Sequence, residues 1–208
     1  MRVLSFNIQG GVRGIDAVAG ALRDLAPDVA CLNEVRGSHR RRIAAITGRH
    51  TLFGPTIGFR RFGNMIISRE PIEPVAQIRL SASPGMERRG LVIARTGDVI
   101  VAATHLGLAG EERLRHVEEI LAALDGFPSV IVGGDFNEEP AGPALARLEG
   151  RLTDSFFAGG QGDGNTFPSN GPRRRIDYIF VRGYDVESCE AVATVVSDHL
   201  PVVAVLDV

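Results

Sequence analysis

The chain has 208 residues, of which 44% are hydrophobic and 23% are charged, a composition typical of a folded globular domain and unlike that of a disordered chain. Its 23 basic residues, all of them arginine, and 25 acidic residues give a formal net charge of -2, which offers no reason to expect a polyanionic partner. No run of about 20 apolar residues is present, and Asn7 and Gln9 interrupt the first apolar stretch, which excludes a signal-peptide core or membrane span there. We therefore expect a cytoplasmic single domain over residues 1–208, with no membrane binding and no indicated protein partner.

The first part of the chain predicts a strand, a helix and a second strand. Residues 3–6 are apolar and stop at Asn7, which is typical of a buried strand that opens into a loop. Residues 15–25 carry apolar side chains at spacings of three and four, and Pro27 follows the end of that helix. Residues 28–32 form the second apolar run, so the chain opens as a strand–helix–strand unit.

Strands and helices continue to alternate along the rest of the chain. In chain order we expect a helix over residues 38–46, a strand over 64–67, a hairpin of strands over 91–95 and 99–103, a helix that ends at Asp125 and Gly126, and strands over 129–132, 176–181 and 200–206. In the long helix, Leu114, Val117, Leu121 and Leu124 are expected to share one buried face. The pattern predicts one α/β domain without a linker, in which the aperiodic residues 158–175 are a candidate rim for a site.

Several apolar runs stop abruptly at residues that ligate metals or contact phosphate. These residues are Asn7, Asn33, Glu34, His105, Asp135, Asn137, Asp177, Ser197, Asp198 and His199. Taken singly they have ordinary alternatives, since the asparagines suit turns, Glu34 suits an exposed position, the histidines suit structural hydrogen bonds, and Asp177 has arginines 173–175 as ion-pair candidates. Because strand ends often meet at one edge of a sheet, their recurrence favours a single site.

The motifs that contain these residues resemble the endonuclease/exonuclease/phosphatase family. In order along the chain they are LSFNIQG, CLNEV, GNMIISR, ATHLG, GGDFNEEP, RIDYIFV and SDHLPV, and they run from Leu4 to Val202. That family includes abasic-site endonucleases, deoxyribonuclease-I-like nucleases, neutral sphingomyelinases and phosphoinositide 5-phosphatases. The resemblance implies an α/β fold, a four-layer α/β/β/α sandwich with two central sheets, mostly antiparallel or mixed, and a site at the top between them.

The resemblance also implies a metal site. Glu34 is expected to be the principal ligand of Mg²⁺, with Mn²⁺ as the alternative, because Mg²⁺ is held by only one or two carboxylates and keeps several waters. Asn7 and Asp198 are expected to complete the surroundings of the ion, partly through water.

The remaining motif residues are expected to carry the hydrolysis of a phosphate ester. Asp135 orients or deprotonates the attacking water, and Asn137 holds Asp135 or a phosphate oxygen. His199 contacts the phosphate while Asp177 fixes its ring, and His105 is a second phosphate contact. These roles make the protein a metal-dependent phosphoesterase.

Arg89 is a less certain substrate contact. The fork of a guanidinium matches phosphate oxygens, but most arginines lie on solvated surfaces. The runs at 40–42, 60–61 and 173–175 have the same two interpretations, because they either remain solvated or together form a basic groove.

The sequence favours a small soluble phosphodiester or phosphomonoester as the substrate. The chain has no Trp and two Tyr for stacking on bases, its charge is balanced, and it is short for the resembled family, which leaves little room for DNA-gripping insertions. A DNA or RNA endonuclease or exonuclease is the alternative function. A phosphate-binding module that keeps the fold without catalysis is the alternative from another class.

Overall fold

The computed structural model describes residues 1–55 and 62–208. The strands are β1 (Arg2–Asn7), β2 (Val29–Arg36), β3 (His50–Pro55), β4 (Phe62–Ser68), β5 (Ile72–Arg79), β6 (Gly90–Thr96), β7 (Val99–His105), β8 (Val130–Asp135), β9 (Thr153–Asp154), β10 (Gly160–Gln161), β11 (Asp177–Arg182), β12 (Asp185–Ala191) and β13 (Val202–Asp207). The helices are α1 (Ile15–Leu25), α2 (Arg40–Thr47), α3 (Gly110–Ala123), α4 (Pro143–Glu149) and α5 (Ser155–Gly159), with the short 3-10 helices η1 (Gln9–Gly11) and η2 (Gly37–His39).

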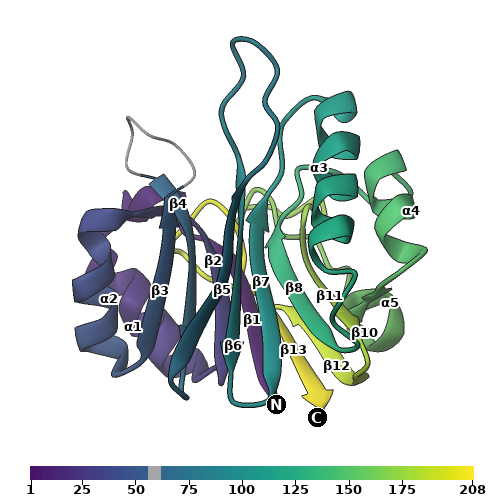
Figure 1. Cartoon of the computed structure of the whole chain (residues 1–208). Helices are drawn as coiled ribbons and strands as arrows, with labels where there is room; N and C mark the ends of the chain where they lie inside the picture. The colour runs from purple at the N-terminus through teal and green to yellow at the C-terminus, as the bar shows by residue number, and fades with distance from the viewer. Residues whose placement is uncertain (56–61) are drawn as a thin grey trace.

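The strands form two sheets that pack face to face (Figure 1). One sheet has seven strands in the order β10-β12-β13-β1-β2-β4-β3, and the other has six in the order β5-β6-β7-β8-β11-β9. Both are mixed, because β1 and β2 pair in parallel and so do β7 and β8, while β4, β6, β11 and β13 join by antiparallel pairing. The expected arrangement of two mixed sheets is confirmed.

Alternating side chains of the strands fill the space between the sheets. Val3 and Cys31 of the first sheet meet Val101, Ile131 and Ile179 of the second in one buried cluster. Because successive side chains of a strand point to opposite faces, the residues two positions further along each strand also face the inner layer. This alternation decides which polar side chains face the inner layer at the end of the sheets.

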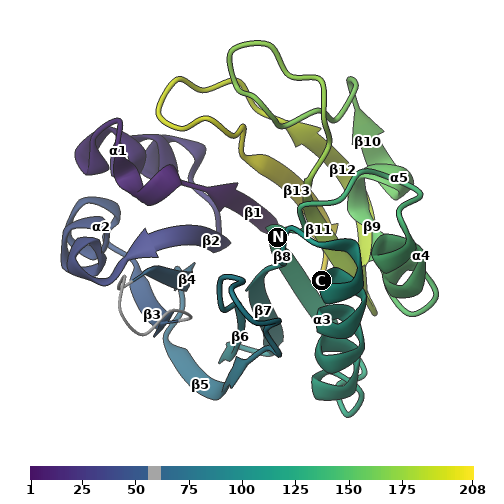
Figure 2. The ribbon, with the colours of Figure 1, turned by 90° about the horizontal axis from the view of Figure 1, so that it is seen from above.

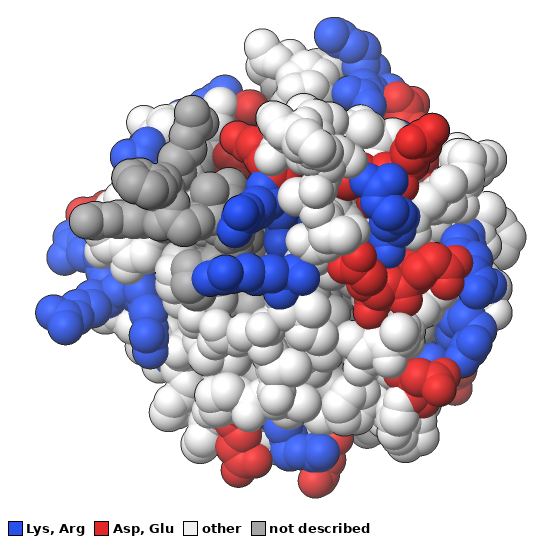
Figure 3. All heavy atoms as spheres, turned by 45° about the horizontal axis from the view of Figure 1, so that its top comes forward, with Lys and Arg blue, Asp and Glu red and all other residues white. Residues whose placement is uncertain are grey.

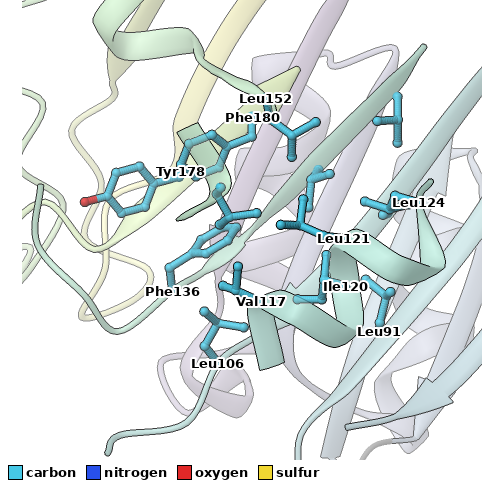
Figure 4. Packing of buried hydrophobic residues seen from close by; sticks show 14 of the residues in the cluster. Leu91, Leu106, Val117, Ile120, Leu121, Leu124, Phe136, Leu152, Tyr178 and Phe180 are labelled. Carbon is cyan, nitrogen blue, oxygen red and sulfur yellow. The ribbon is translucent and has the colours of Figure 1, made fainter. Parts of the chain in front are cut away.

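Helices cover the outer face of each sheet. Val18 and Leu22 of α1 pack with Leu4 and Leu32 behind the first sheet. Behind the second sheet, α3 and α4 pack on an aromatic cluster (Figure 4). In this cluster the ring centre of Phe136 lies 5.5 Å from that of Tyr178 and 5.2 Å from that of Phe180. The chain therefore has the four layers α/β/β/α.

The buried face of α3 differs from the predicted one. Leu114 is 37% exposed, whereas Val117, Ile120 and Leu121 are buried. The buried stripe is centred near Ile120, so Leu114 falls at its margin. None of the helices within residues 1–55 and 62–208 is long and apolar enough to cross a membrane.

The second predicted strand is longer than expected. It does not end at Leu32 but continues through Asn33 and Glu34 to Arg36, with an irregularity in its pairing to β4 between Leu32 and Val35. Glu34 has a left-handed backbone, with φ of 54°. A bulge of this kind re-aims a side chain without ending the strand.

Candidate active site

The polar residues predicted at strand ends meet at one edge of the sandwich, the upper edge in Figure 1, which Figure 2 shows from above. Strand pairing places Asn7 opposite Asn33, and Asp135 opposite both His105 and Asp177. These five strand-end residues each lie an even number of positions from an apolar residue of the same strand that faces the inner layer. Their side chains therefore also face the space between the sheets.

Asn33 joins the two sheets beneath the site. Its Nδ2 donates to Oδ1 of Asn64, at 2.9 Å, and to the backbone carbonyl of Thr104, at 2.7 Å. Its Oδ1 accepts the backbone N–H of Asp135 at 2.9 Å. Sequence reasoning placed Asn33 among the strand-end polar residues but gave it no individual role, although its position two residues after the inner-layer residue Cys31 was a usable signal.

Glu34, Asn7 and Asp198, the three expected metal-site residues, lie together. Nδ2 of Asn7 donates to Oε1 of Glu34 at 3.0 Å and to Oδ2 of Asp135 at 3.0 Å. Oγ of Ser197 donates to the carbonyl of Asn7 at 2.7 Å and lies 3.3 Å from Oδ1 of Asp198. Both Glu34 and Asp198 are half-buried, so their oxygens remain accessible to a hydrated cation.

The amide of Asn7 is turned so that its nitrogen, and not its oxygen, faces the two carboxylates. Its Oδ1 accepts the backbone N–H of Gln9 at 3.0 Å. In this orientation Asn7 positions Glu34 and Asp135.

Asp135 is the buried carboxylate at the centre of the site. It is 2% exposed, and its Oδ1 accepts the backbone N–H of Asn137 at 2.9 Å. Burial, and then the negative charge of Asp177, raise the pKa of Asp135 to about 7, against the opposing effects of His199 and Asn7.

Asp177 and His199 form a buried pair. Nδ1 of His199 donates to Oδ2 of Asp177 at 2.8 Å, which leaves Nε2 directed toward Asp135, 3.9 Å from its Oδ2. Burial alone lowers the pKa of His199, but the charge and hydrogen bond of Asp177 outweigh it and raise the pKa to about 9. The contact with Asp177 therefore favours the protonated form of the ring.

Thr166 supports this pair and was missed by sequence reasoning. It is fully buried, and its Oγ1 donates to Oδ2 of Asp177 at 2.6 Å. Nearby, the ring of Phe167 lies 4.8 Å from the ring of His199. Both residues belong to the aperiodic stretch 158–175, where no periodicity marked them.

His105, Asn137 and Arg89 form the opposite wall of the site. Nε2 of His105 lies 3.3 Å from Oδ2 of Asp135 and 3.0 Å from Nδ2 of Asn137, and Nδ1 lies 3.1 Å from Nη1 of Arg89. Burial, and then the positive charges of Arg89 and His199, hold the pKa of His105 well below its usual 6.5. The structure thus brings together all nine residues expected at the site.

A metal ion has two candidate places here. One ligand atom from each of Asp135, Asp177 and His199 lies within 4.8 Å of the others, a group that could hold an ion, and Oδ1 of Asp177 is buried without a hydrogen-bond partner in the structure. Glu34 and Asp198 are half-buried and offer oxygen ligands, the kind that suits a hard ion such as Mg²⁺.

The arginine runs are largely paired away from the site. Arg174 pairs with Glu139 at 2.8 Å, and Arg175 pairs with Asp154 at 2.6 Å while its guanidinium lies 4.5 Å from the ring centre of Tyr178. The expected alternative, a pair between Asp177 and one of these arginines, is not seen among the described ion pairs of Asp177. Arginines 60 and 61 lie outside the described residues.

Comparison with known proteins identifies the family. The model of the Endonuclease/Exonuclease/phosphatase family matches residues 4–199. The chain belongs to this family. Both activities in the family's name, nuclease and phosphatase, hydrolyse phosphate esters.

Individual relatives match this chain over nearly its whole length. The protein named Uncharacterized protein YbhP of Escherichia coli (strain K12) is 27% identical, over 98% of this chain and 94% of YbhP. A functionally unknown conserved protein of Enterococcus faecalis V583 has a TM-score of 0.85 at 20% identity, covering 100% of this chain and 99% of that one. The mannosyl-6-phosphatase of Bacteroides thetaiotaomicron VPI-5482 has a TM-score of 0.84 at 16% identity, covering 100% of both chains. At such identities these two structures show a shared fold.

Proposed function

We propose that this protein is a divalent-metal-dependent phosphoesterase that hydrolyses a small soluble phosphate ester. The observation that carries the proposal is the setting of Asp135, a buried carboxylate whose pKa is raised to about 7, between Glu34 on one side and the His199–Asp177 pair on the other. A general base is most effective when its pKa lies near the working pH, which this setting provides.

Asp135 orients the attacking water and accepts its proton. The backbone N–H of Asn137 and Nδ2 of Asn7 each hold one of its oxygens, so the carboxylate keeps one orientation while the oxygen of water bonds to phosphorus and the ester P–O bond breaks to release the alcohol.

His199 stabilises the phosphoryl group. Its protonated Nε2 faces the site and donates to a phosphate oxygen, while Asp177, supported by Thr166, keeps Nδ1 occupied and the ring in place. His105, Asn137 and Arg89 line the opposite wall of the site.

Glu34, with Asp198 and Asn7 beside it, would hold the Mg²⁺ or Mn²⁺ ion. When bound, such an ion neutralises charge on the phosphoryl oxygens.

Several features support a small substrate. The chain has a net charge of -2, and the face in Figure 3 carries arginine and acidic side chains side by side, so the described residues form no uniformly basic surface there. The shared fold of the mannosyl-6-phosphatase supports testing sugar phosphate monoesters. A DNA or RNA nuclease is the alternative that the same chemistry would serve.

A substrate panel tests the proposal. We would assay p-nitrophenyl phosphate, bis(p-nitrophenyl) phosphate, hexose 6-phosphates, plasmid DNA and single-stranded RNA with Mg²⁺, Mn²⁺ or EDTA. We expect metal-dependent turnover of a small ester with a kcat/KM above that for either nucleic acid. Faster cleavage of nucleic acid would favour the nuclease, and metal-dependent binding without turnover would favour the non-catalytic module.

A further inference from the structure

Arg89 is buried, yet few of its N–H groups have partners. It is 7% exposed and lies at the end of the loop between β5 and β6, which rises above the site in Figure 1. Nη1 contacts Nδ1 of His105 at 3.1 Å, Nη2 reaches the carboxylate of Glu87 at 3.4 Å, and buried Nε has no hydrogen-bond partner in the structure. Burying a charged guanidinium costs free energy because it loses its contacts with water. We therefore expect the contact of Arg89 with His105 to serve the site.

The contact between Arg89 and His105 defines where the imidazole carries its proton. A guanidinium has donors and no acceptor, so Nδ1 of His105 must present its lone pair to Nη1. The ring then carries its proton on Nε2, which lies 3.3 Å from the carboxylate oxygen Oδ2 of Asp135. The other tautomer would set an N–H against an N–H at Arg89 and a lone pair against a carboxylate at Asp135.

Asn137 is affected by the same assignment. Its Nδ2 lies 3.0 Å from the carbonyl of Leu106 and 3.0 Å from Nε2 of His105. Once Nε2 carries a hydrogen, it has no lone pair for Asn137. The Nε2–H tautomer therefore costs the contact with Asn137, which keeps its bond to Leu106, and Arg89 must outweigh that loss to fix the tautomer.

We propose that Arg89 is a positioning residue: its hydrogen bond to Nδ1 of His105 selects the Nε2–H tautomer, which places the imidazole hydrogen beside the carboxylate of Asp135. The catalytic consequence rests on the proposed function, whereas the tautomer is a property of the free protein. The lowered pKa of His105 agrees with a neutral ring at neutral pH.

The tautomer is measured directly by long-range ¹H–¹⁵N NMR of histidine-labelled protein without metal or substrate, with His105→Gln used to assign the signal. We expect a protonated Nε2 and an unprotonated Nδ1 in the wild type and in Arg89→Lys, which retains a donor. In Arg89→Met we expect the Nδ1–H form to become populated. Arg88→Met is the matched control, because it removes the same charge from an exposed neighbour and should leave the signal unchanged.

A protonated Nδ1 in the wild type would overturn the proposal, and so would an unchanged tautomer in folded Arg89→Met. These readouts do not depend on turnover, so they remain decisive if no substrate is hydrolysed.

Kinetics distinguish positioning from direct phosphate binding. We expect Arg89→Met to lower kcat by roughly 10- to 100-fold, as loss of an outer partner of a reactive group usually does, with little change in KM and substantial recovery in Arg89→Lys. A raised KM with unchanged kcat would assign Arg89 to substrate binding and contradict the proposal.

Discussion

Glu34 and Asp135 share one hydrogen-bond donor, the side-chain nitrogen of Asn7, but lie in different surroundings. Glu34 is half-buried on a bulged strand, whereas Asp135 is 2% exposed and next to a second carboxylate. Water access suits a ligand of a hydrated cation, and burial suits a group that must exchange a proton near neutral pH. The two carboxylates therefore suit different roles, metal binding for Glu34 and proton transfer for Asp135.

Glu34→Gln should weaken Mg²⁺ or Mn²⁺ binding, because the amide keeps the volume of the side chain but loses its charge. The loss should exceed the roughly 10- to 100-fold change typical of an outer-shell partner, and activity should partly recover at high metal concentration. Titration calorimetry checks this, with Glu73→Gln on an exposed part of β5 as the control. Unchanged metal affinity in Glu34→Gln would remove Glu34 from the metal site.

Asp177→Asn and His199→Ala should each lower kcat by about tenfold or more, and the double variant should be little worse than the poorer single one, because Asp177 acts through His199. A double-mutant cycle measures this, and fully additive losses would show that the two residues act independently.

The dependence of kcat/KM on pH tests whether Asp177 sets the pKa of His199, because a purely structural role of Asp177 would leave that dependence unchanged. Asp177 favours the protonated form of His199, so its removal lowers that pKa from about 9. If the imidazolium is the active form, activity is lost as pH rises through this pKa. The alkaline limb of kcat/KM should therefore shift to lower pH in Asp177→Asn.

At the scale of elements, Gly133 lets β8 approach the opposite sheet beside the site. A Cβ at Gly133 would lie 2.8 Å from Cβ of Cys31, which is closer than packed atoms tolerate. Gly20 in α1 has no neighbour within 4 Å of such an atom and is a matched control.

Gly133→Ala should destabilise the fold by about 1–3 kcal/mol through overpacking, whereas Gly20→Ala should be neutral or stabilising by up to about 1 kcal/mol through helix propensity. Urea unfolding measures both. Equal stability of Gly133→Ala and the wild type would show that the two sheets are not tightly packed at this point.

Strong apolar periodicity made the central elements predictable. The strand at 3–6, the helix at 15–25 and the hairpin of β6 and β7 are found, and Gly97 in the hairpin turn has the positive φ expected of a Gly-Asp turn. Peripheral elements were missed because their patterns are weak: β5 contains Pro74, and β12 is largely polar. Both strands are largely exposed or half-buried, so they leave little apolar signal.

The candidate site was predictable in its residues but not in their contacts. Motifs and strand ends pointed to Glu34, Asp135 and His199, because polar residues are unusual at the end of buried runs. The bulge at Glu34 and the bond from Thr166 to Asp177 depend on tertiary packing, which local patterns do not encode.

For the molecule as a whole, the balance of charge predicts a weak salt dependence. A protein that makes 6–10 phosphate contacts with B-DNA loses roughly 10³- to 10⁵-fold in affinity between 50 and 200 mM salt. With a net charge of -2 and paired arginines at 174 and 175, this site should engage one phosphate, so kcat/KM for a small ester should change only several-fold. Parallel assays on plasmid DNA and a small phosphodiester test this, and efficient, steeply salt-sensitive DNA cleavage that exceeds turnover of the small ester would establish the nuclease instead.

The most direct test of metal-dependent hydrolysis through Asp135 is the rate of bis(p-nitrophenyl) phosphate hydrolysis against metal concentration for the wild type and Asp135→Asn. Wild-type turnover should vanish in EDTA and return with Mg²⁺ or Mn²⁺. Asp135→Asn should bind the substrate with similar KM but lower kcat by roughly 10²- to 10⁴-fold, because the amide cannot accept the proton of water, and added metal should not restore it. Near-normal turnover by Asp135→Asn, or wild-type turnover that persists in EDTA, would contradict the account.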